Sequence, residues 1–377
     1  MTSRLNVFTK LSSITLIVGA LVAAQGCSKS ASFSLLSDSA SFTQNSAEVN
    51  GKIDILFVID NSGSMATSQQ NLATNIQTFF DKFDQQGFDY QIAVTTSEAY
   101  RSKFGAGPAI SKYRDGVGSA HTGYFLVTPT TPNRVNVFKS NILQGTSGNG
   151  DERVFSSFKE ALDNADNKAM DFPRAGAFFS IIMLSDADDL SASVAGSIDT
   201  SGAGAYGTPA HMAMYTDSRI DSVQSYIDYL DLKMGVTGSS TSNDRSSKYN
   251  VNTIGVLDAA CEVSSENRKH GDRMVQLTNM TGGITGSLCG NFGETLSNIS
   301  HKIIELRTRF TIERQINPDT LKVFVNGIEV PRVTDATPAP WNGIYFHADD
   351  NSVSFHGTAV PSPGASISVS FDPTSIK

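Results

Sequence analysis

The sequence predicts an α/β protein with a doubly wound, mostly parallel sheet, followed by a small C-terminal all-β sandwich domain. Continuous apolar runs at residues 55–59 and 178–184 are too short for helices and are typical of strands buried on both faces. Such runs alternate with helical periodicity over residues 51–310, which favours parallel strands joined by crossover helices. From residue 312 the apolar residues recur with a period of two, which predicts a β-sandwich at 311–377.

The elements of the α/β region follow from the same patterns in chain order. The strand at 55–59 leads into a helix at 67–83, whose apolar residues fall at helical spacing, and then into a second strand at 89–96. Further strands are predicted at 123–127, 178–184, 249–257 and 281–287, and further helices at 134–143, 152–164, 218–233, 268–278 and 292–307.

Length and charge narrow the class of protein. A chain of 377 residues exceeds the usual size of one domain, so one large domain and one small domain are expected. The chain has 29 Lys and Arg residues against 37 Asp and Glu residues, a net charge of −8. This balance speaks against a nucleic-acid partner and against polybasic attraction to anionic lipid.

Residues 1–26 have the composition of a lipoprotein-type signal peptide. Positively charged residues precede an apolar stretch at 11–24 that is too short to span a bilayer as a helix. The stretch ends in Ala-Ala-Gln-Gly-Cys, which resembles a bacterial lipobox with Cys27 as the acylated residue. The alternative is cleavage after Ala24, which would give a soluble secreted protein.

The lipobox resemblance also implies a location. Ser28 after the acylated cysteine points to the outer membrane or cell surface, with a lipid anchor as the contact with the membrane. A periplasmic or secreted protein is the alternative. Residues 27–50 are rich in Ser, Ala and Asn and predict a flexible tether between the anchor and the folded region.

Two of the three cysteines remain once Cys27 is assigned to lipidation. Cys261 and Cys289 have no histidine nearby at zinc-ligand spacing. In an exported protein the simplest interpretation is one disulfide between them, and two buried free thiols are the alternative.

A polar turn follows the first buried strand. Asp60, Ser62 and Ser64 offer only hard oxygen donors, which suit Mg²⁺, Mn²⁺ or Ca²⁺. Their spacing lets the side chains converge if the turn curls, and Gly63 permits the curl. Because the turn lies at the carboxyl edge of a parallel sheet, it predicts a binding site. The alternative is a polar N-cap for the following helix.

The second buried strand repeats this arrangement. The run at 178–184 ends in Ser-Asp-Ala-Asp-Asp, so Asp186 is predicted at the same edge of the sheet as the first polar turn. Asp188 and Asp189 either add negative potential, bind a further ion or cap the loop. A glycine-rich loop at 145–152 precedes a predicted helix.

The Asp-x-Ser-x-Ser pattern of the first turn resembles the start of the metal-ion-dependent adhesion site of the von Willebrand factor A domain family. The resemblance covers residues 51–310. It implies that Asp186 is the second acidic member of the site. It also implies a third hydroxyl ligand from the loop before the helix, for which Thr146 is our choice and Ser147 the rival.

The resemblance implies a function as well. In this family the ion, here Mg²⁺ or alternatively Mn²⁺ or Ca²⁺, keeps an open position that an acidic group of a partner fills. A divalent-cation-dependent adhesion module on the bacterial envelope is therefore expected, with a protein or glycan partner. A structural subunit of an envelope complex with a stabilising metal is one alternative.

An enzyme is the competing class, and we expect the protein not to be one. The sequence contains no Gly-x-Ser-x-Gly elbow, no His-Glu-x-x-His motif and no Cys/His pairing, and its six histidines are scattered. A metal-dependent hydrolase that uses Asp60, Asp186 and Asp188 is the remaining enzymatic alternative.

Overall fold

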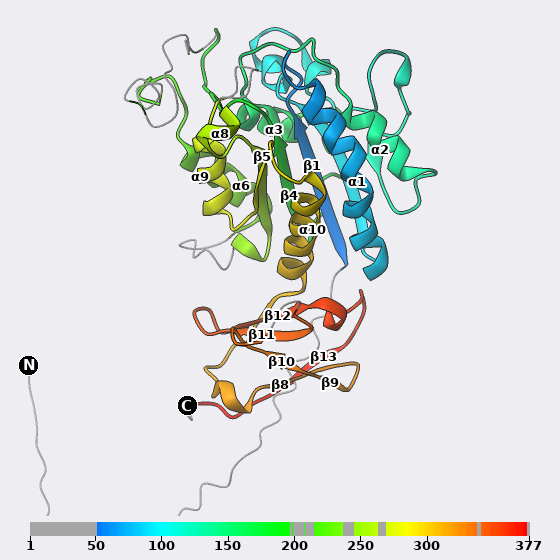
Figure 1. Cartoon of the computed structure of the whole chain (residues 1–377), viewed down its shortest axis with the longest axis vertical. Helices are drawn as coiled ribbons and strands as arrows, with labels where there is room; N and C mark the ends of the chain where they lie inside the picture. Colours follow the sequence, from blue (N-terminus) through cyan, green and yellow to red (C-terminus); the bar gives the residue numbers. More distant parts are fainter. Residues whose placement is uncertain are drawn as a thin grey trace, which may run out of the picture. The chain divides into compact units, whose positions relative to one another are not determined.

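A six-stranded sheet forms the centre of the α/β region (Figure 1). The computed structural model describes residues 51–196, 198, 208, 215–236, 245–262, 269–337 and 341–374. The strands lie in the order β3-β2-β1-β4-β5-β6, all parallel except that β3 is antiparallel to β2. This confirms the predicted doubly wound, mostly parallel sheet. The strands are β1 (Lys52–Ile59), β2 (Asp89–Thr96), β3 (Leu126–Val127), β4 (Phe178–Leu184), β5 (Tyr249–Gly255) and β6 (Thr285–Ser287).

Helices cover both faces of this sheet. Helices α1, α2 and α10 contribute to the apolar cluster on one face, and α3, α6 and α9 contribute to the cluster on the other face (Figure 1). The helices are α1 (Ala66–Gln86), α2 (Arg134–Ile142), α3 (Val154–Asp163), α4 (Ala165–Lys168), α6 (Val223–Met234), α8 (Ala259–Glu262), α9 (Asp272–Met280) and α10 (Phe292–Thr308).

Some predicted boundaries were wrong, for local reasons. Helix α6 begins at Val223 and not at 218, because the hydroxyl of Ser222 accepts the N–H of Ser225 at 3.2 Å and caps the helix there. The predicted strand at 281–287 is reduced to β6, because the N–H of Thr281 bonds back to the carbonyl of Leu277 at 3.2 Å and ends α9.

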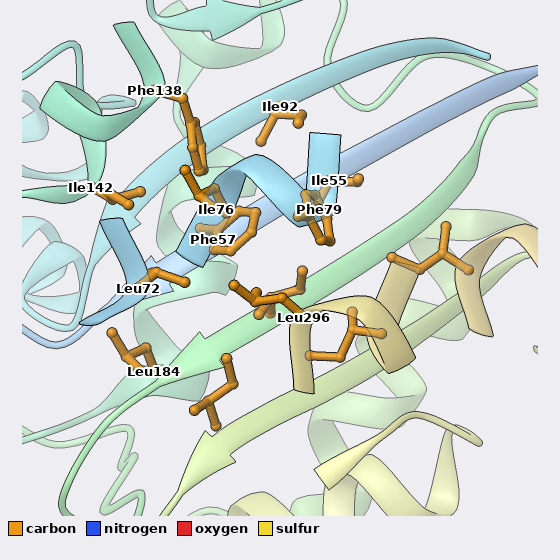
Figure 2. Packing of buried hydrophobic residues seen from close by; sticks show 14 of the residues in the cluster. Ile55, Phe57, Leu72, Ile76, Phe79, Ile92, Phe138, Ile142, Leu184 and Leu296 are labelled. Atoms are coloured by element: carbon orange, nitrogen blue, oxygen red, sulfur yellow. The ribbon is translucent and has the colours of Figure 1, made fainter. Parts of the chain in front are cut away.

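Strand β1 shows why the predicted apolar run is buried on both faces. Ile55 and Phe57 pack toward α1, and Leu56 and Val58 pack toward the opposite face. The Phe57 ring meets that of Phe138 edge to face at 5.0 Å between centroids (Figure 2). Burial of each such side chain stabilises the fold by roughly 1.5–3 kcal/mol. The sheet is therefore a rigid base for the loops at its edges.

The C-terminal part contains two small sheets that share one apolar cluster. A tight turn at Asn326 and Gly327 joins β8 (Lys322–Val325) to β9 (Ile328–Val330), with φ of 51° and 80° at the two turn residues. One sheet contains β10 (Arg332–Val333), β11 (Gly343–His347), β12 (Ser352–His356) and β7 (Phe310–Thr311). The other contains β13 (Ile367–Ser370), β8 (Lys322–Val325) and β9 (Ile328–Val330).

The predicted disulfide is confirmed. Cys261 in α8 and Cys289 just before α10 are bonded with an S–S distance of 2.09 Å, and they close a loop of 28 residues. In the chain-entropy model such a loop stabilises the fold by roughly 3–4 kcal/mol.

The predictions for the amino end concern residues that the structure does not describe. The signal peptide at 1–26, lipidation of Cys27 and the tether at 27–50 all lie outside the described residues. Within the described residues, every helix is too short or too polar to cross a membrane.

Candidate metal centre

Asp60 and Asp186, the two acidic residues of the predicted metal site, lie at the same edge of the sheet. Strands β1 and β4 are parallel neighbours, with Ile59 opposite Leu184. The pairing continues one residue further, because the N–H of Asp60 donates to the carbonyl oxygen of Leu184 at 2.9 Å. Asp60 and Asp186 therefore follow the ends of adjacent strands.

Hydrogen bonds hold the Asp60 carboxylate in one orientation. Its Oδ1 accepts the N–H of Ser62 at 2.8 Å, and its Oδ2 accepts the hydroxyl of Ser185 at 2.7 Å. The hydroxyl of Ser97, after β2, donates to Oδ1 at 3.4 Å. Burial raises the pKa of Asp60, and these three donors partly oppose that rise. The residues after β1, β2 and β4 thus converge on one carboxylate.

The serines of the first turn are not used to cap the helix that follows. Met65 is the N-cap of α1, and no side chain caps that end. Ser62 is buried and its hydroxyl oxygen makes no hydrogen bond of normal geometry within the described residues, whereas Ser64 is half-buried. The alternative role as a polar N-cap is therefore wrong.

The glycine-rich loop packs against the first turn. Gln69 of α1 donates from Nε2 to the carbonyl oxygens of Asp60 at 2.9 Å and Gly145 at 2.8 Å. The N–H of Gly148 donates to the carbonyl of Asn61 at 2.8 Å. A Cβ at Gly148 would lie 2.6 Å from that same oxygen, so only glycine allows this close approach.

Within this loop, neither candidate for the third hydroxyl makes a hydrogen bond to Asp60 in the described part of the chain. The side chains of Thr146 and Ser147 are exposed and make no side-chain hydrogen bond within the described residues. The choice between them stays a prediction.

Asp186 itself is buried, with 3% of its surface exposed. Its carbonyl oxygen accepts the N–H of Lys269 at 2.8 Å, which joins the loop after β4 to the segment before α9.

Asp188 and Asp189 hold helices in place. Asp188 accepts the backbone N–H groups of Arg273 at 3.0 Å and Met274 at 3.2 Å, at the start of α9. Asp189 accepts the N–H of Phe155 at 2.8 Å, at the start of α3. Burial raises the pKa of Asp188 to about 6, against the effect of these donors. Of the predicted roles, capping is the one that the contacts support.

One acidic residue at this edge was missed by the sequence reasoning. Glu152 is buried, and its carbonyl oxygen accepts the N–H of Leu190 at 3.0 Å, from the loop that contains Asp186. Burial raises the pKa of Glu152 to about 9, and the Asp60 and Asp186 carboxylates add to the rise. The signal in the sequence is an acidic residue just before a predicted helix, whereas the family resemblance implies a hydroxyl ligand, Thr146, from the same loop.

The residues present fit a hard divalent cation. In the described part of the chain, no group of three or more His, Cys, Asp or Glu side chains is placed to hold a metal ion. The donors are instead a mixture of hydroxyls and carboxylates, which suits an ion that keeps bound water. Ser62 lowers the pKa values of both Asp60 and Glu152. A cation there would offset two carboxylates that burial makes costly to ionise.

A hollow of about 390 Å³ lies beside the glycine-rich loop. Its lining includes Tyr100, Arg101, Phe104, Asn149 and Asp151. Glu98 connects this hollow to the glycine-rich loop. Its carboxylate accepts the N–H of Asn149 at 3.1 Å and pairs with Arg101 at 2.5 Å.

The sequence matches no protein-family model and no curated protein. Among solved structures, the chain is similar to the pilus adhesin SpaC from Lactobacillus rhamnosus GG in its open conformation. The identity is 12%, the match covers 85% of this chain and 38% of that one, and the TM-score is 0.40.

The chain is also similar to proximal thread matrix protein 1 from the mussel byssus with a zinc-occupied MIDAS motif. The identity is 13%, with 71% of this chain and 50% of that one covered and a TM-score of 0.35. For the adhesive tip pilin GBS104 from Group B Streptococcus agalactiae the identity is 10%, the coverage 87% and 79%, and the TM-score 0.33. The chain spans half or less of SpaC and of the byssus protein. Likeness of this degree carries no functional inference.

Proposed function

We propose that the protein is a divalent-cation-dependent adhesion module of the von Willebrand factor A type. The cation is Mg²⁺, or alternatively Mn²⁺ or Ca²⁺, and it is bound at the edge of the sheet where Asp60 and Asp186 lie. Ser62, Ser64 and a residue of the glycine-rich loop complete the protein's ligands. A protein or glycan partner supplies an oxygen at the open position.

The observation that carries this proposal is the hydrogen bond from Ser185 to Asp60. It holds the loops after β1 and β4 together, which supports a single site for the two predicted acidic residues. Hydroxyl ligands leave a cation electrophilic, because they do not neutralise its charge. Such an ion attracts an oxygen donor from a partner.

The surroundings of the site support a binding role. The hollow beside Asn149 offers aromatic, cationic and anionic side chains next to the loop that packs on Asn61. A partner that reaches the cation could also contact this wall. Attachment of the module to the outer membrane through Cys27 is part of the proposal and rests on the lipobox resemblance alone.

The proposal is tested with the full-length protein on an array of purified extracellular-matrix proteins and glycans. We expect binding in Mg²⁺ that is lost in EDTA and in the Asp60→Ala variant. The matched control is Asp228→Ala, which removes an exposed carboxylate of α6 and should bind like the wild type. Binding that survives both chelation and Asp60→Ala would refute the adhesion role.

The second candidate is a structural subunit whose metal only stabilises the fold. The number of hydrogen bonds that already hold Asp60 favours this alternative, because they make the edge of the sheet rigid. In that case Mg²⁺ would raise the melting temperature of the protein, and the array would show no cation-dependent binding.

A further inference from the structure

We propose that the hollow beside the glycine-rich loop binds one uncharged sugar unit of the partner, a hexose or an N-acetylhexosamine. This inference rests on the proposed function, because it names the class of partner of the same adhesion module. It assigns recognition of the sugar to the hollow and leaves the cation to bind an oxygen elsewhere on the same glycan.

The size and the aromatic surface of the hollow suit a small ligand. Its volume of about 390 Å³ lies at the lower end of the range of roughly 300–1,000 Å³ found for small-molecule sites. Phe104 is half-buried in its wall, and its ring meets that of the buried Tyr100 edge to face at 6.2 Å between centroids. The C–H groups on one face of a sugar ring are apolar, so they can pack on an aromatic ring.

The charged residues of the wall are already paired within the protein. Arg101 donates from Nη1 to Oε1 of Glu98 at 2.5 Å. Asp151 pairs with Arg153 at 3.0 Å and accepts the hydroxyl of Tyr100 at 3.1 Å. A charged ligand would find no unpaired countercharge on these residues and would still lose part of its hydration. The hollow is therefore suited to a neutral ligand.

The wall also keeps hydrogen-bonding groups for a ligand. A guanidinium has five N–H donors, and within the described residues that of Arg101 bonds only to Glu98. Asn149 is exposed, and its Oδ1 accepts the N–H of Asp151 at 3.2 Å, whereas its Nδ2 makes no hydrogen bond to a described residue. A sugar hydroxyl can both accept from such donors and donate to a carboxylate. Free donors beside paired charges favour a neutral ligand with several hydroxyls.

Hydrogen bonds hold the wall in place without a ligand. The N–H of Ala106 donates to the carbonyl of Arg101 at 3.1 Å. Arg153 donates to the carbonyl of Val194 at 2.8 Å and to that of Gly196, which lines the hollow. A wall that is already ordered costs less entropy when it binds a ligand.

Glu98 links the hollow to the proposed metal centre. Its Oε2 accepts Nδ2 of Asn61 at 3.4 Å, and its Oε1 accepts the N–H of Asn149 at 3.1 Å. Asn61 lies between Asp60 and Ser62 in the chain. A glycan of several units that fills the hollow therefore lies beside the loop that carries Asp60.

The first test is saturation-transfer difference NMR on the full-length protein. The probes are the methyl glycosides of glucose, galactose and N-acetylglucosamine, and we expect at least one of them to bind. Arg101→Gln should weaken that binding by at least about tenfold, because a charged donor is lost, and Asn149→Ala should weaken it roughly two- to tenfold.

Each of these variants has a matched control. Arg219→Gln changes an arginine that is also paired with a nearby acidic residue, with a side chain 44% exposed against 42% for Arg101. Asn136→Ala removes an exposed amide of α2. Both controls should bind the sugar like the wild type. The proposal is overturned if no probe binds the wild type, or if Arg101→Gln and Asn149→Ala bind like their controls.

Packing of the sugar on the aromatic ring is tested with Phe104→Leu. This variant keeps an apolar side chain but removes the flat ring, so we expect the affinity for the sugar to fall several-fold. Phe125→Leu, at an exposed phenylalanine outside the lining of the hollow, is the control and should bind like the wild type. Equal affinity of the two variants would contradict packing on Phe104.

The preference for a neutral ligand is tested with charged forms of the sugar that binds. Its uronate and its amino sugar have the same ring with a negative or a positive charge. We expect both to bind at least about tenfold more weakly than the neutral sugar, because the charges of the wall are already paired. Tighter binding of either charged form would overturn the inference of a neutral ligand.

The final experiment separates this inference from the proposed function. The NMR measurement is repeated in EDTA and with Asp60→Ala, and sugar binding should persist in both, because no residue of the wall is a proposed metal ligand. Loss of sugar binding in both would place the sugar on the cation and overturn the proposal. If the sugar binds but the glycan array shows no Mg²⁺-dependent binding, the hollow stands and the adhesion role fails. If array binding depends on Mg²⁺ but is unchanged in Arg101→Gln, the adhesion role stands and this inference fails.

Discussion

The hydroxyl of Ser185 donates to Oδ2 of Asp60 at 2.7 Å, and these are the first residues after β4 and β1. Both side chains are buried, so the bond is shielded from water. It fixes the orientation of the carboxylate before any cation binds. Because the Asp60 carboxylate is already oriented, binding of an ion requires less rearrangement of the site.

Replacing Ser185 should therefore affect both stability and metal binding. We expect Ser185→Ala to lower the free energy of unfolding by about 1.5–3 kcal/mol, because a buried carboxylate loses a donor. It should also weaken Mn²⁺ binding several-fold. Urea unfolding and Mn²⁺ titration check the two effects. Ser193→Ala, which removes a hydroxyl that bonds Asp221 at an exposed position, is the matched control. A Ser185→Ala protein that equals the control in both measurements would count against preorganisation.

Arg153 should be among the most sensitive positions for stability. Arg153→Met leaves Asp151 and the carbonyls of Ala192 and Val194 without their cationic donor. Breaking a buried pair from one side costs about 3–5 kcal/mol. The control is Arg219→Met, which breaks the largely exposed pair with Asp217 and should unfold at nearly the wild-type urea concentration. The free energy of unfolding of both variants is measured by urea unfolding. Equal losses would show that Arg153 does not hold Asp151 and the two carbonyl groups together.

The roles of Asp188 and Asp189 can be separated from metal binding. We expect Asp189→Asn to destabilise the fold by about 3 kcal/mol or more, because Arg273 loses its charged partner. Asp188→Asn should also destabilise the fold. Both variants should still bind Mn²⁺ with unchanged stoichiometry. Loss of Mn²⁺ without loss of stability would instead support a further ion site or the metal-hydrolase alternative.

The C-terminal sheet should lose stability in acid. Ser354 Oγ lies 2.8 Å from His347 Nε2 and 2.9 Å from His356 Nε2. Burial lowers the pKa of both imidazoles below the usual 6.5, and the Arg309 guanidinium adds to the effect at His347. Both imidazoles are therefore harder to protonate in the folded protein than in the unfolded chain. The free energy of unfolding should be highest above about pH 6.5 and should fall as the pH drops below that value.

Urea unfolding at a series of pH values checks this prediction. The acid-dependent loss should shrink in His356→Gln and in His347→Gln. If either sheet variant keeps the full slope, the titrating group lies elsewhere.

The parts of the fold that could be predicted are those set by local pattern. Strands β2 and β4 begin and end at the predicted residues. For β4 the reason is that an apolar run buried on both faces has sharp ends. The common edge of Asp60 and Asp186 follows from the same patterns, since parallel strands end together. The pairing of Cys261 with Cys289 followed by elimination once Cys27 was assigned to lipidation.

The rest depends on loops that meet only in the folded chain. Gln69 looks like an ordinary helix residue, yet it joins the loops at Asp60 and Gly145. Ser185 and Glu152 gain their roles from neighbours more than 30 residues away, and no local spacing encodes those contacts. The same holds for Asp188, whose carboxylate receives N–H groups of α9.

The most direct measurement is the stoichiometry of Mn²⁺ binding to the full-length wild type and to Asp60→Ala, with Asp228→Ala as the control. We predict one Mn²⁺ per chain in the wild type and in the control, and none in Asp60→Ala. An Asp60→Ala protein that binds one Mn²⁺ with wild-type affinity would contradict it.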